Sequence, residues 1–147
     1  SASDPEVDEF ISLRRLNRYI AILIDSDKSG VRSPINETKR RVRDEFDAGP
    51  GFAWVTKGRE IENYIPADMM EQAVKKVHPS AVTLSKMGQY DHCLCYRTGK
   101  RKTITADKVK VAHEVIKSPA NFNVLDLKKM VEKTVKFIHA SNDMDMT

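Results

Sequence analysis

An apolar run that ends on two aspartates constrains the fold of this chain more than any other feature. Residues 19–24 read Tyr-Ile-Ala-Ile-Leu-Ile, and Asp25, Ser26 and Asp27 follow them directly. A short Ile-rich run of this kind is typical of a strand buried on both faces, as at the centre of a parallel sheet. Because residues i and i+2 of a strand point the same way, we expect the carboxylates of Asp25 and Asp27 to lie together just beyond the strand.

Two neighbouring carboxylates repel each other unless a positive group lies between them. A divalent cation such as Mg²⁺ is the usual solution, since it prefers oxygen ligands and binds one or two carboxylates together with water and phosphate. The sequence therefore predicts a metal site at the carboxyl edge of the sheet, where open α/β folds bind ligands. The alternative interpretation is a strand followed by an Asp-rich turn that binds nothing.

The apolar fraction of 40% and the charged fraction of 31% are those of a soluble, single-domain globular protein. No apolar run approaches the roughly 20 residues that span a bilayer, and no signal peptide opens the chain, so we expect a cytoplasmic protein with no membrane partner. Cys93 and Cys95 lack a second cysteine pair for a zinc site, and we interpret them as small buried side chains of a strand, with a metal or redox role as the less favoured alternative.

The net charge of +4 does not by itself require a nucleic-acid partner. The distribution of the basic residues is more informative, because they form clusters that either contact phosphates or simply face solvent on helices. The clusters are Arg14, Arg15 and Arg18; Lys39, Arg40, Arg41 and Arg43; Lys100, Arg101 and Lys102; and Lys128, Lys129, Lys133 and Lys136.

Helix signals and strand signals alternate in the first part of the chain. Ser33 and Pro34 predict a helix start, and residues 48–51 (Ala-Gly-Pro-Gly) predict its end. A strand over residues 52–56 follows, which gives a βαβ unit and hence a parallel pair. Further helices are expected over residues 4–17, from Pro66 or Asp68 to Val77, over 106–117 with Thr105 as cap, and over 124–140; a short strand is expected over 93–96, and residues 141–147 are expected to form a disordered tail.

A second acidic segment, Arg59-Glu60-Ile61-Glu62-Asn63-Tyr64, follows the strand at residues 52–56. It lies at the same predicted sheet edge as Asp25, which makes Glu60 and Glu62 candidates to join the metal site. If this segment is extended, both glutamates face one way; the alternative is an exposed charged turn. His92 beside Asp91 is interpreted as a surface pair, because no nucleophile is evident nearby.

Lys108 and Lys110 lie at the predicted start of a helix, where the helix dipole disfavours a positive charge by roughly 0.3–1 kcal/mol. Such a violation tends to have a functional reason or a nearby acid. The two lysines are therefore candidate site residues.

These segments together resemble the topoisomerase–primase (TOPRIM) domain, and most closely its form in the overcoming-lysogenisation-defect (OLD) family of ATP-dependent endonucleases. The resemblance covers about Leu13 to Ile116. It rests on the aspartate pair, on the Glu-Asn-Tyr sequence at residues 62–64, and on the helix-start lysine followed by small and apolar residues.

The resemblance implies an α/β fold: a small parallel sheet flanked by helices, a partial TOPRIM (Rossmann-like) domain over residues 4–140 with extra C-terminal helices. It implies a bacterial DNA endonuclease that uses Mg²⁺ or Mn²⁺, acting in phage or foreign-DNA defence or in DNA repair. Asp25, Asp27 and Glu62 would bind the metal, Glu60 or Glu62 would position water, and Lys108, less favourably Lys110, would neutralise charge on the phosphate. No other cofactor site is implied.

One departure from the TOPRIM pattern is that no strand ending in glutamate precedes residue 19. The chain also has no Gly-rich phosphate loop, so the ATPase domain of an OLD protein is expected elsewhere in a larger chain, and a homodimer is possible. Two alternatives remain: a degenerate TOPRIM module that binds nucleic acid or a partner without catalysis, and a flavodoxin-like receiver in which Asp25 accepts a phosphoryl group.

Overall fold

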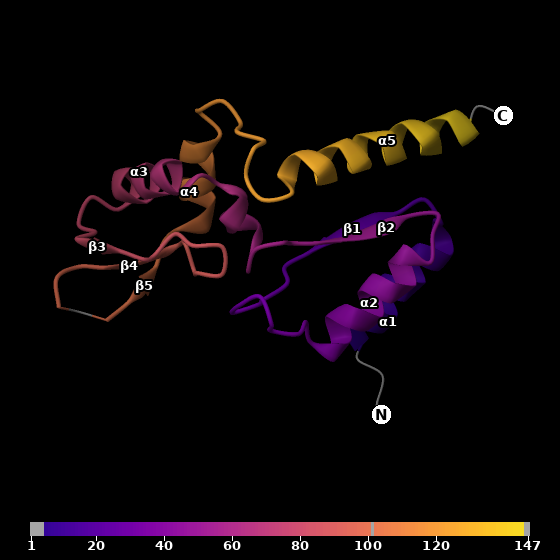
Figure 1. The fold of residues 1–147 in the computed structure, drawn as a ribbon, viewed down its shortest axis with the longest axis horizontal. Helices are drawn as coiled ribbons and strands as arrows, with labels where there is room; N and C mark the ends of the chain where they lie inside the picture. The colour runs from indigo at the N-terminus through magenta and orange to yellow at the C-terminus, as the bar shows by residue number, and fades with distance from the viewer. Residues whose placement is uncertain (1–4, 101, 146–147) are drawn as a thin grey trace.

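The computed structural model describes residues 5–100 and 102–145, which form two lobes (Figure 1). Asp4 of the helix expected over residues 4–17, Arg101 of a basic cluster and residues 146–147 of the expected tail lie outside this range. The first lobe contains α1 (Pro5–Leu16), β1 (Ala21–Ile24), α2 (Glu37–Asp47), β2 (Phe52–Val55) and α5 (Leu127–Asp145). The second contains α3 (Ala67–Val77), β3 (Thr83–Leu84), β4 (Cys95–Arg97), β5 (Ile104–Thr105) and α4 (Lys108–Val115). A short 3₁₀ helix, η1 (Ile61–Tyr64), lies between the lobes.

The βαβ unit predicted for the first lobe is confirmed. β1 and β2 pair in parallel, with Ala21 opposite Phe52 and Ile24 opposite Val55. The buried face of α2 packs Val42 and Phe46 against this sheet and α1. The chain then enters β2 through Gly51, where a Cβ atom would lie only 1.7 Å from the Ile20 carbonyl oxygen, so no other residue fits this close approach.

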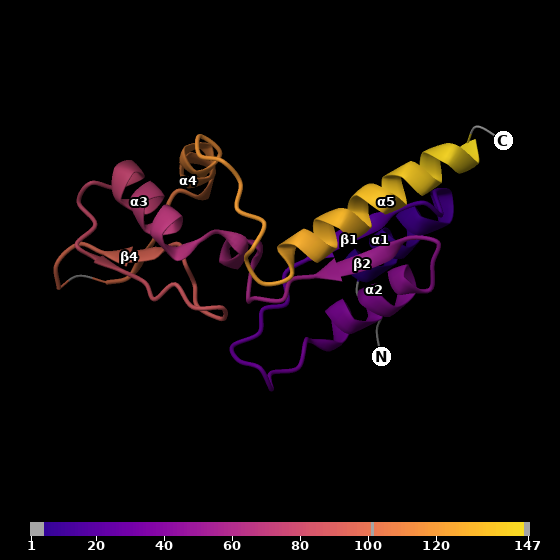
Figure 2. The same cartoon turned by 45° about the horizontal axis from the view of Figure 1, so that its top comes forward.

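α5 covers the sheet of the first lobe on the side away from α1 and α2 (Figures 1 and 2). The rings of Phe52 and Phe137 meet edge to face at 5.6 Å between centroids, and Lys133 Nζ lies 4.5 Å from the Phe52 ring centre. The sequence placed the end of this helix at Ala140, but α5 continues to Asp145. No Gly or Pro stops it, and Ser141 Oγ donates to the Phe137 carbonyl, so residues 141–145 are helical rather than part of a tail.

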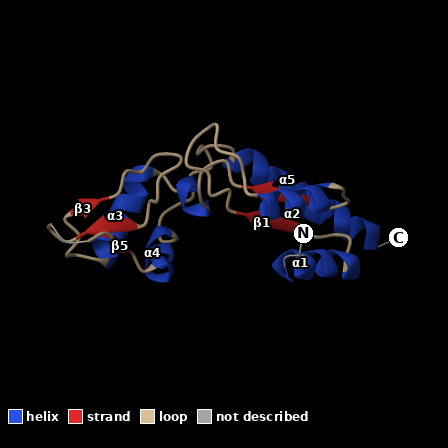
Figure 3. Cartoon of the chain, turned by 90° about the horizontal axis from the view of Figure 1, so that it is seen from below, coloured by secondary structure: helices blue, strands red, loops and turns tan. Residues whose placement is uncertain are grey.

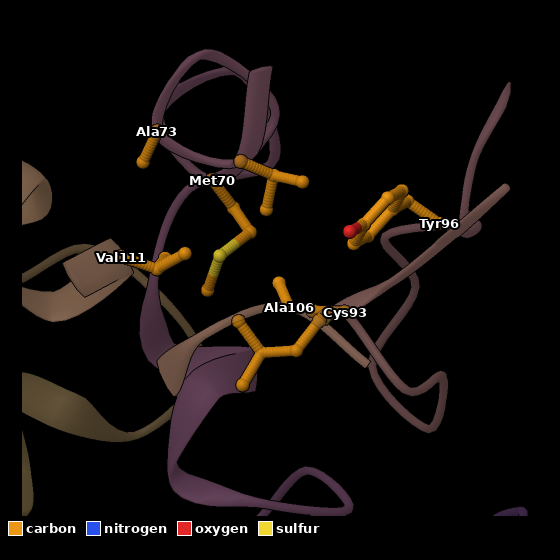
Figure 4. Close-up of a cluster of buried hydrophobic side chains, with 8 residues drawn as sticks. Met70, Ala73, Cys93, Tyr96, Ala106 and Val111 are labelled. Carbon is orange, nitrogen blue, oxygen red and sulfur yellow. The ribbon is translucent and has the colours of Figure 1, made fainter. Parts of the chain in front are cut away.

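The second lobe has its own antiparallel sheet (Figure 3), and its strand order is β3-β4-β5 (Figure 1). The expectation of one small parallel sheet is therefore only partly correct, because β3 and β5 are two-residue strands that leave no periodicity in the sequence. Helices α3 and α4 pack together over this sheet. Their shared core is separate from that of the first lobe and is made of Met70, Ala73, Val74, Cys93, Leu94, Tyr96, Ala106 and Val111 (Figure 4).

Two helix starts differ from the predicted ones because a nearby side chain caps the helix better. Asn36 Oδ1, not Ser33, accepts the Lys39 amide at 2.8 Å and begins α2. Asp107, not Thr105, caps α4 by accepting the Lys110 amide at 3.0 Å. The second shift makes Lys108 the first residue of α4. Among the described residues, no helix is both long and apolar enough to cross a bilayer.

Candidate active site between the two lobes

The loops that follow β1 and β2 are hydrogen-bonded to each other around the buried Ser26. Its amide donates to Thr56 Oγ1 at 2.9 Å, and its hydroxyl donates to the Gly58 carbonyl at 2.6 Å. The Thr56 amide in turn donates to the Ile24 carbonyl at 2.9 Å. Because Ser26 is 2% exposed, these bonds hold both strand ends together in a region without water.

Asp25 lies against the start of η1. Its Oδ1 accepts the Ile61 amide at 2.8 Å, so the end of β1 contacts the acidic segment that follows β2. This contact brings together Asp25 and the acidic segment after β2, which were both predicted to lie at one sheet edge. The bond occupies one of the two carboxylate oxygens of Asp25.

Asp27 is oriented differently from Asp25. Its backbone has a φ of 55°, which is outside the strand region, and its amide donates to the Arg59 carbonyl at 2.9 Å. The Asp27 carboxylate forms an ion pair with Lys39, whose ammonium also donates to the Asp25 carbonyl oxygen at 2.6 Å. The strand alternation that would align Asp25 with Asp27 thus stops at Ile24, and the two carboxylates have different partners.

The segment carrying the two glutamates is not extended. The Asn63 amide donates to the Glu60 carbonyl at 3.1 Å, which closes a 3₁₀ turn, and Asn63 Oδ1 accepts the Glu60 amide at 2.7 Å; the turn sends the two glutamate side chains to different neighbours. Glu60 Oε1 lies 3.0 Å from His92 Nδ1. Glu62 turns inward instead and is 8% exposed.

Glu62 and Lys108 form the ion pair at the centre of the site. Lys108 Nζ contacts Glu62 Oε1, whereas Glu62 Oε2 is buried and has no hydrogen-bond partner in the described part of the chain. The hydrogen bond to Glu62 raises the pKa of Lys108; partial burial opposes this shift, and the charges of Glu62, Asp25 and Glu60 add to it. The two side chains also line a cavity of about 260 Å³ that is otherwise apolar.

The two candidate lysines, Lys108 and Lys110, have different partners. Lys108 reaches Glu62, whereas Lys110 Nζ lies 3.8 Å from Asp107, the cap of its own helix. The nearby acid expected for a lysine at a helix start is therefore Glu62 for Lys108 and the capping aspartate for Lys110.

Asn63 holds the loop that carries His92 in place, a role that was not predicted from the sequence. Its Nδ2 donates to the carbonyl oxygens of Gly88 and Asp91, each at 3.0 Å, and lies 3.2 Å from Cys93 Sγ. These bonds fix the loop that carries His92. The sequence suggested His92 with Asp91, but Asp91 Oδ2 accepts the Gly88 amide and His92 pairs with Glu60.

In comparisons with known proteins, no family model, curated protein or solved structure matches the chain. The side chains of the site themselves indicate its chemistry. The unpartnered, buried oxygen of Glu62 fits a cation, because an uncompensated buried carboxylate is costly. Within the described residues, no group of three or more acidic, His or Cys side chains is arranged as a metal site, and Lys39 and Lys108 now neutralise two of the acids.

Proposed function

We propose that this chain is a divalent-metal-dependent DNA endonuclease domain that hydrolyses phosphodiester bonds. The observation that carries the proposal is the buried Glu62, which has one oxygen on Lys108 and the other without a partner, next to a segment hydrogen-bonded to Asp25. Buried carboxylates that remain half-partnered occur where a cation or a reacting group completes them.

Asp25 and Glu62 would hold Mg²⁺ or Mn²⁺, with Asp27 as a third ligand once Lys39 moves away from it. Both ions prefer such oxygen ligands. When bound, the ion would polarise the phosphate and lower the pKa of an attacking water. Glu60, which already orients the His92 ring, would position that water by accepting a hydrogen bond.

Lys108 would bind the phosphate as a point charge. Its side chain is 62% exposed, so its ammonium can leave Glu62 for an anionic ligand without crossing the core. A cation at the first turn of α4 is unfavourable for the helix dipole. Pairing with a metal-bound phosphate would remove that disadvantage and would stabilise negative charge that develops during cleavage.

The TOPRIM resemblance, in its OLD-family form, is consistent with this site and is part of the proposal. In such a domain a preceding strand ending in glutamate would complete the metal site, and an ATPase domain would belong to the same protein. β1 pairs only with β2 among the described strands, so its other edge has no strand partner there, and residues of β1 and α1, such as Ile22 and Phe10, line a cavity of about 450 Å³. Such a strand would pair at this edge. We propose a role in phage or foreign-DNA defence or in DNA repair.

A second candidate function is a TOPRIM module that binds nucleic acid or a partner without catalysis. The observation that favours it is that Lys39 and Lys108 neutralise Asp27 and Glu62 within the chain itself. A site whose acids are permanently paired with lysines has no need of a metal.

Nicking of supercoiled plasmid DNA by the full-length protein separates these candidates. The endonuclease proposal predicts relaxation with Mg²⁺ or Mn²⁺, none with EDTA, and loss of activity by at least about 100-fold in Asp25→Ala and Glu62→Gln. Asp68→Asn, an exposed acid of α3, is the control and should retain full activity. Equal activity in Asp25→Ala and the unmodified protein would contradict the proposal.

A further inference from the structure

The lysines of α5 form a positively charged surface that the proposed chemistry does not use. Lys129, Lys133 and Lys136 are spaced i, i+4 and i+7, so they line one side of the helix, and we call them the basic row. All three are exposed. Glu132 is the only acid between Leu127 and Asn142, so this side of the helix carries a clear excess of positive charge.

Glu132 lies on the same side of α5 as Lys129 and Lys136, but among the described residues no carboxylate forms an ion pair with a lysine of the basic row. The ion pairs of the described residues use other lysines, which are Lys39, Lys76, Lys108, Lys110 and Lys117. Lys133 Nζ instead lies over the Phe52 ring at 4.5 Å, a contact that leaves its charge uncompensated. A row of unpaired lysines that repel one another is stabilised by an external anion.

The start of α5 is fixed next to the candidate active site. Tyr64, two residues after Glu62, donates its hydroxyl proton to Asp126 Oδ1 at 2.7 Å, and Asp126 directly precedes α5. The same hydroxyl accepts from Trp54 Nε1 at 3.0 Å and from the Lys57 amide at 3.1 Å. The basic row therefore begins about one helical turn from a residue bonded to the Glu62 segment and continues along the first lobe (Figure 2).

We propose that the basic row binds the sugar–phosphate backbone of a DNA strand and leads that strand into the candidate active site. From Lys129 to Lys136 the helix rises roughly 10 Å. That length matches about three nucleotide steps of one strand of a duplex. The direction of the strand rests on the proposed endonuclease function, whereas the binding itself does not.

Fluorescence anisotropy with a short fluorescein-labelled duplex, in EDTA so that no cleavage occurs, tests the row. Lys129→Gln/Lys133→Gln/Lys136→Gln should bind about 10-fold more weakly and lower the slope of log K against log salt by about 2 to 3. The control is Lys75→Gln/Lys86→Gln/Arg97→Gln, which removes the same charge from exposed basic residues of the second lobe outside the basic clusters. It should bind within about two-fold of the unmodified chain and keep its salt slope.

Lys129→Gln/Lys136→Gln, which retains the Lys133–Phe52 contact, guards against a folding defect and should still lower the slope by about 2. Equal weakening in the row and control variants, or no binding by the unmodified chain at low salt, would overturn the inference. If the proposed endonuclease function is wrong but the basic row binds DNA, the experiments give a different result. Asp25→Asn would then nick DNA like the unmodified protein, while the row variants would still lose binding.

Discussion

Lys108 Nζ contacts Glu62 Oε1 while the other oxygen of that buried carboxylate, Oε2, has no partner within the described residues. The pair joins α4 of the second lobe to η1, which is itself hydrogen-bonded to Asp25 of the first lobe. Residues far apart in the sequence therefore meet where the two lobes meet. This junction holds the charges that the proposed function requires.

Lys108→Met should destabilise the chain because it leaves both oxygens of Glu62 buried without a partner. A lost charged hydrogen bond costs about 1–3 kcal/mol, and the 62% exposure of Lys108 favours the lower half of that range. Urea unfolding at neutral pH measures the change, with Lys110→Met as control. Glu62→Gln/Lys108→Met should recover most of the loss, since it removes the buried charge together with its partner.

The Glu62–Lys108 ion pair also determines the pH range over which Lys108→Met destabilises the chain. Because the pKa of Lys108 is raised in the folded state, its contribution is complete below the ordinary lysine pKa of about 10.4 and is lost as the pH rises through the folded value. The stability difference between the unmodified chain and Lys108→Met should thus be constant near neutral pH and shrink only in strong alkali. A difference that disappears below about pH 9 would show that another group is responsible.

Asn63→Ala should destabilise the chain by about 2 kcal/mol, because the amide bonds two carbonyl oxygens of the His92 loop and the Glu60 amide. Urea unfolding checks the magnitude. Asn123→Ala, in an exposed loop, should change stability by less than about 0.5 kcal/mol. If both variants unfold at the same urea concentration, Asn63 does not organise the loop.

The fold of the first lobe was predictable because its signals are local. The Ile-rich run at 19–24, the apolar spacing of α2 and the Gly-Pro sequence after it define the βαβ unit without reference to distant residues. The same holds for α3, which begins directly after Pro66 and ends two residues before Pro79.

The details of the site were not predictable because they depend on contacts between distant residues. The positive φ of Asp27 and its pairing with Lys39 arise only when α2 packs on β1. The 3₁₀ turn at Ile61–Tyr64 replaces an extended segment because Asn63 bonds both the Glu60 amide and the His92 loop. The alternation of Glu60 and Glu62 with apolar and polar neighbours does not reveal the contact between Asn63 and the His92 loop.

Tyr64→Phe should loosen α5 from the rest of the chain. The Tyr64 hydroxyl links Asp126 to Trp54 and to the Lys57 amide, so its removal leaves polar groups unpaired at a cost of about 1–2 kcal/mol. Hydrogen exchange should accelerate in the first turns of α5 while α3 stays unchanged. Tyr90→Phe is the control, since the hydroxyl of Tyr90 accepts only from its neighbour Gln89 among the described contacts.

Cys93 should resist alkylation in the folded chain. Burial, with the charges of Asp91, Glu60 and Glu62 adding to it, raises the pKa of its thiol to about 11. Roughly one molecule in a thousand therefore carries the reactive thiolate at pH 8. Iodoacetamide labelling followed by tandem mass spectrometry should show Cys93 unmodified until denaturant is added, and rapid labelling of Cys93 in the folded chain would contradict its burial.

The pKa of Cys93 also predicts a loss of stability in alkali. Its folded pKa lies above the unfolded value of about 8.5, so the favourable term is complete below that pH and is lost as the pH approaches about 11. Cys93→Ala should show a flatter decline of unfolding free energy over this interval. A parallel decline in both proteins would assign the alkaline transition to other groups.

Calorimetric titration of the chain with Mn²⁺ measures binding at the proposed metal site itself, because it needs neither DNA nor activity. If Asp25 and Glu62 bind the ion, the titration gives a saturable binding heat, and Asp25→Asn and Glu62→Gln each lower the affinity by at least about 10-fold. The matched controls Asp68→Asn and Glu71→Gln, exposed acids of α3, should keep it. A heat that is absent, or that persists unchanged in Glu62→Gln, would contradict the metal site and leave the non-catalytic module as the better description.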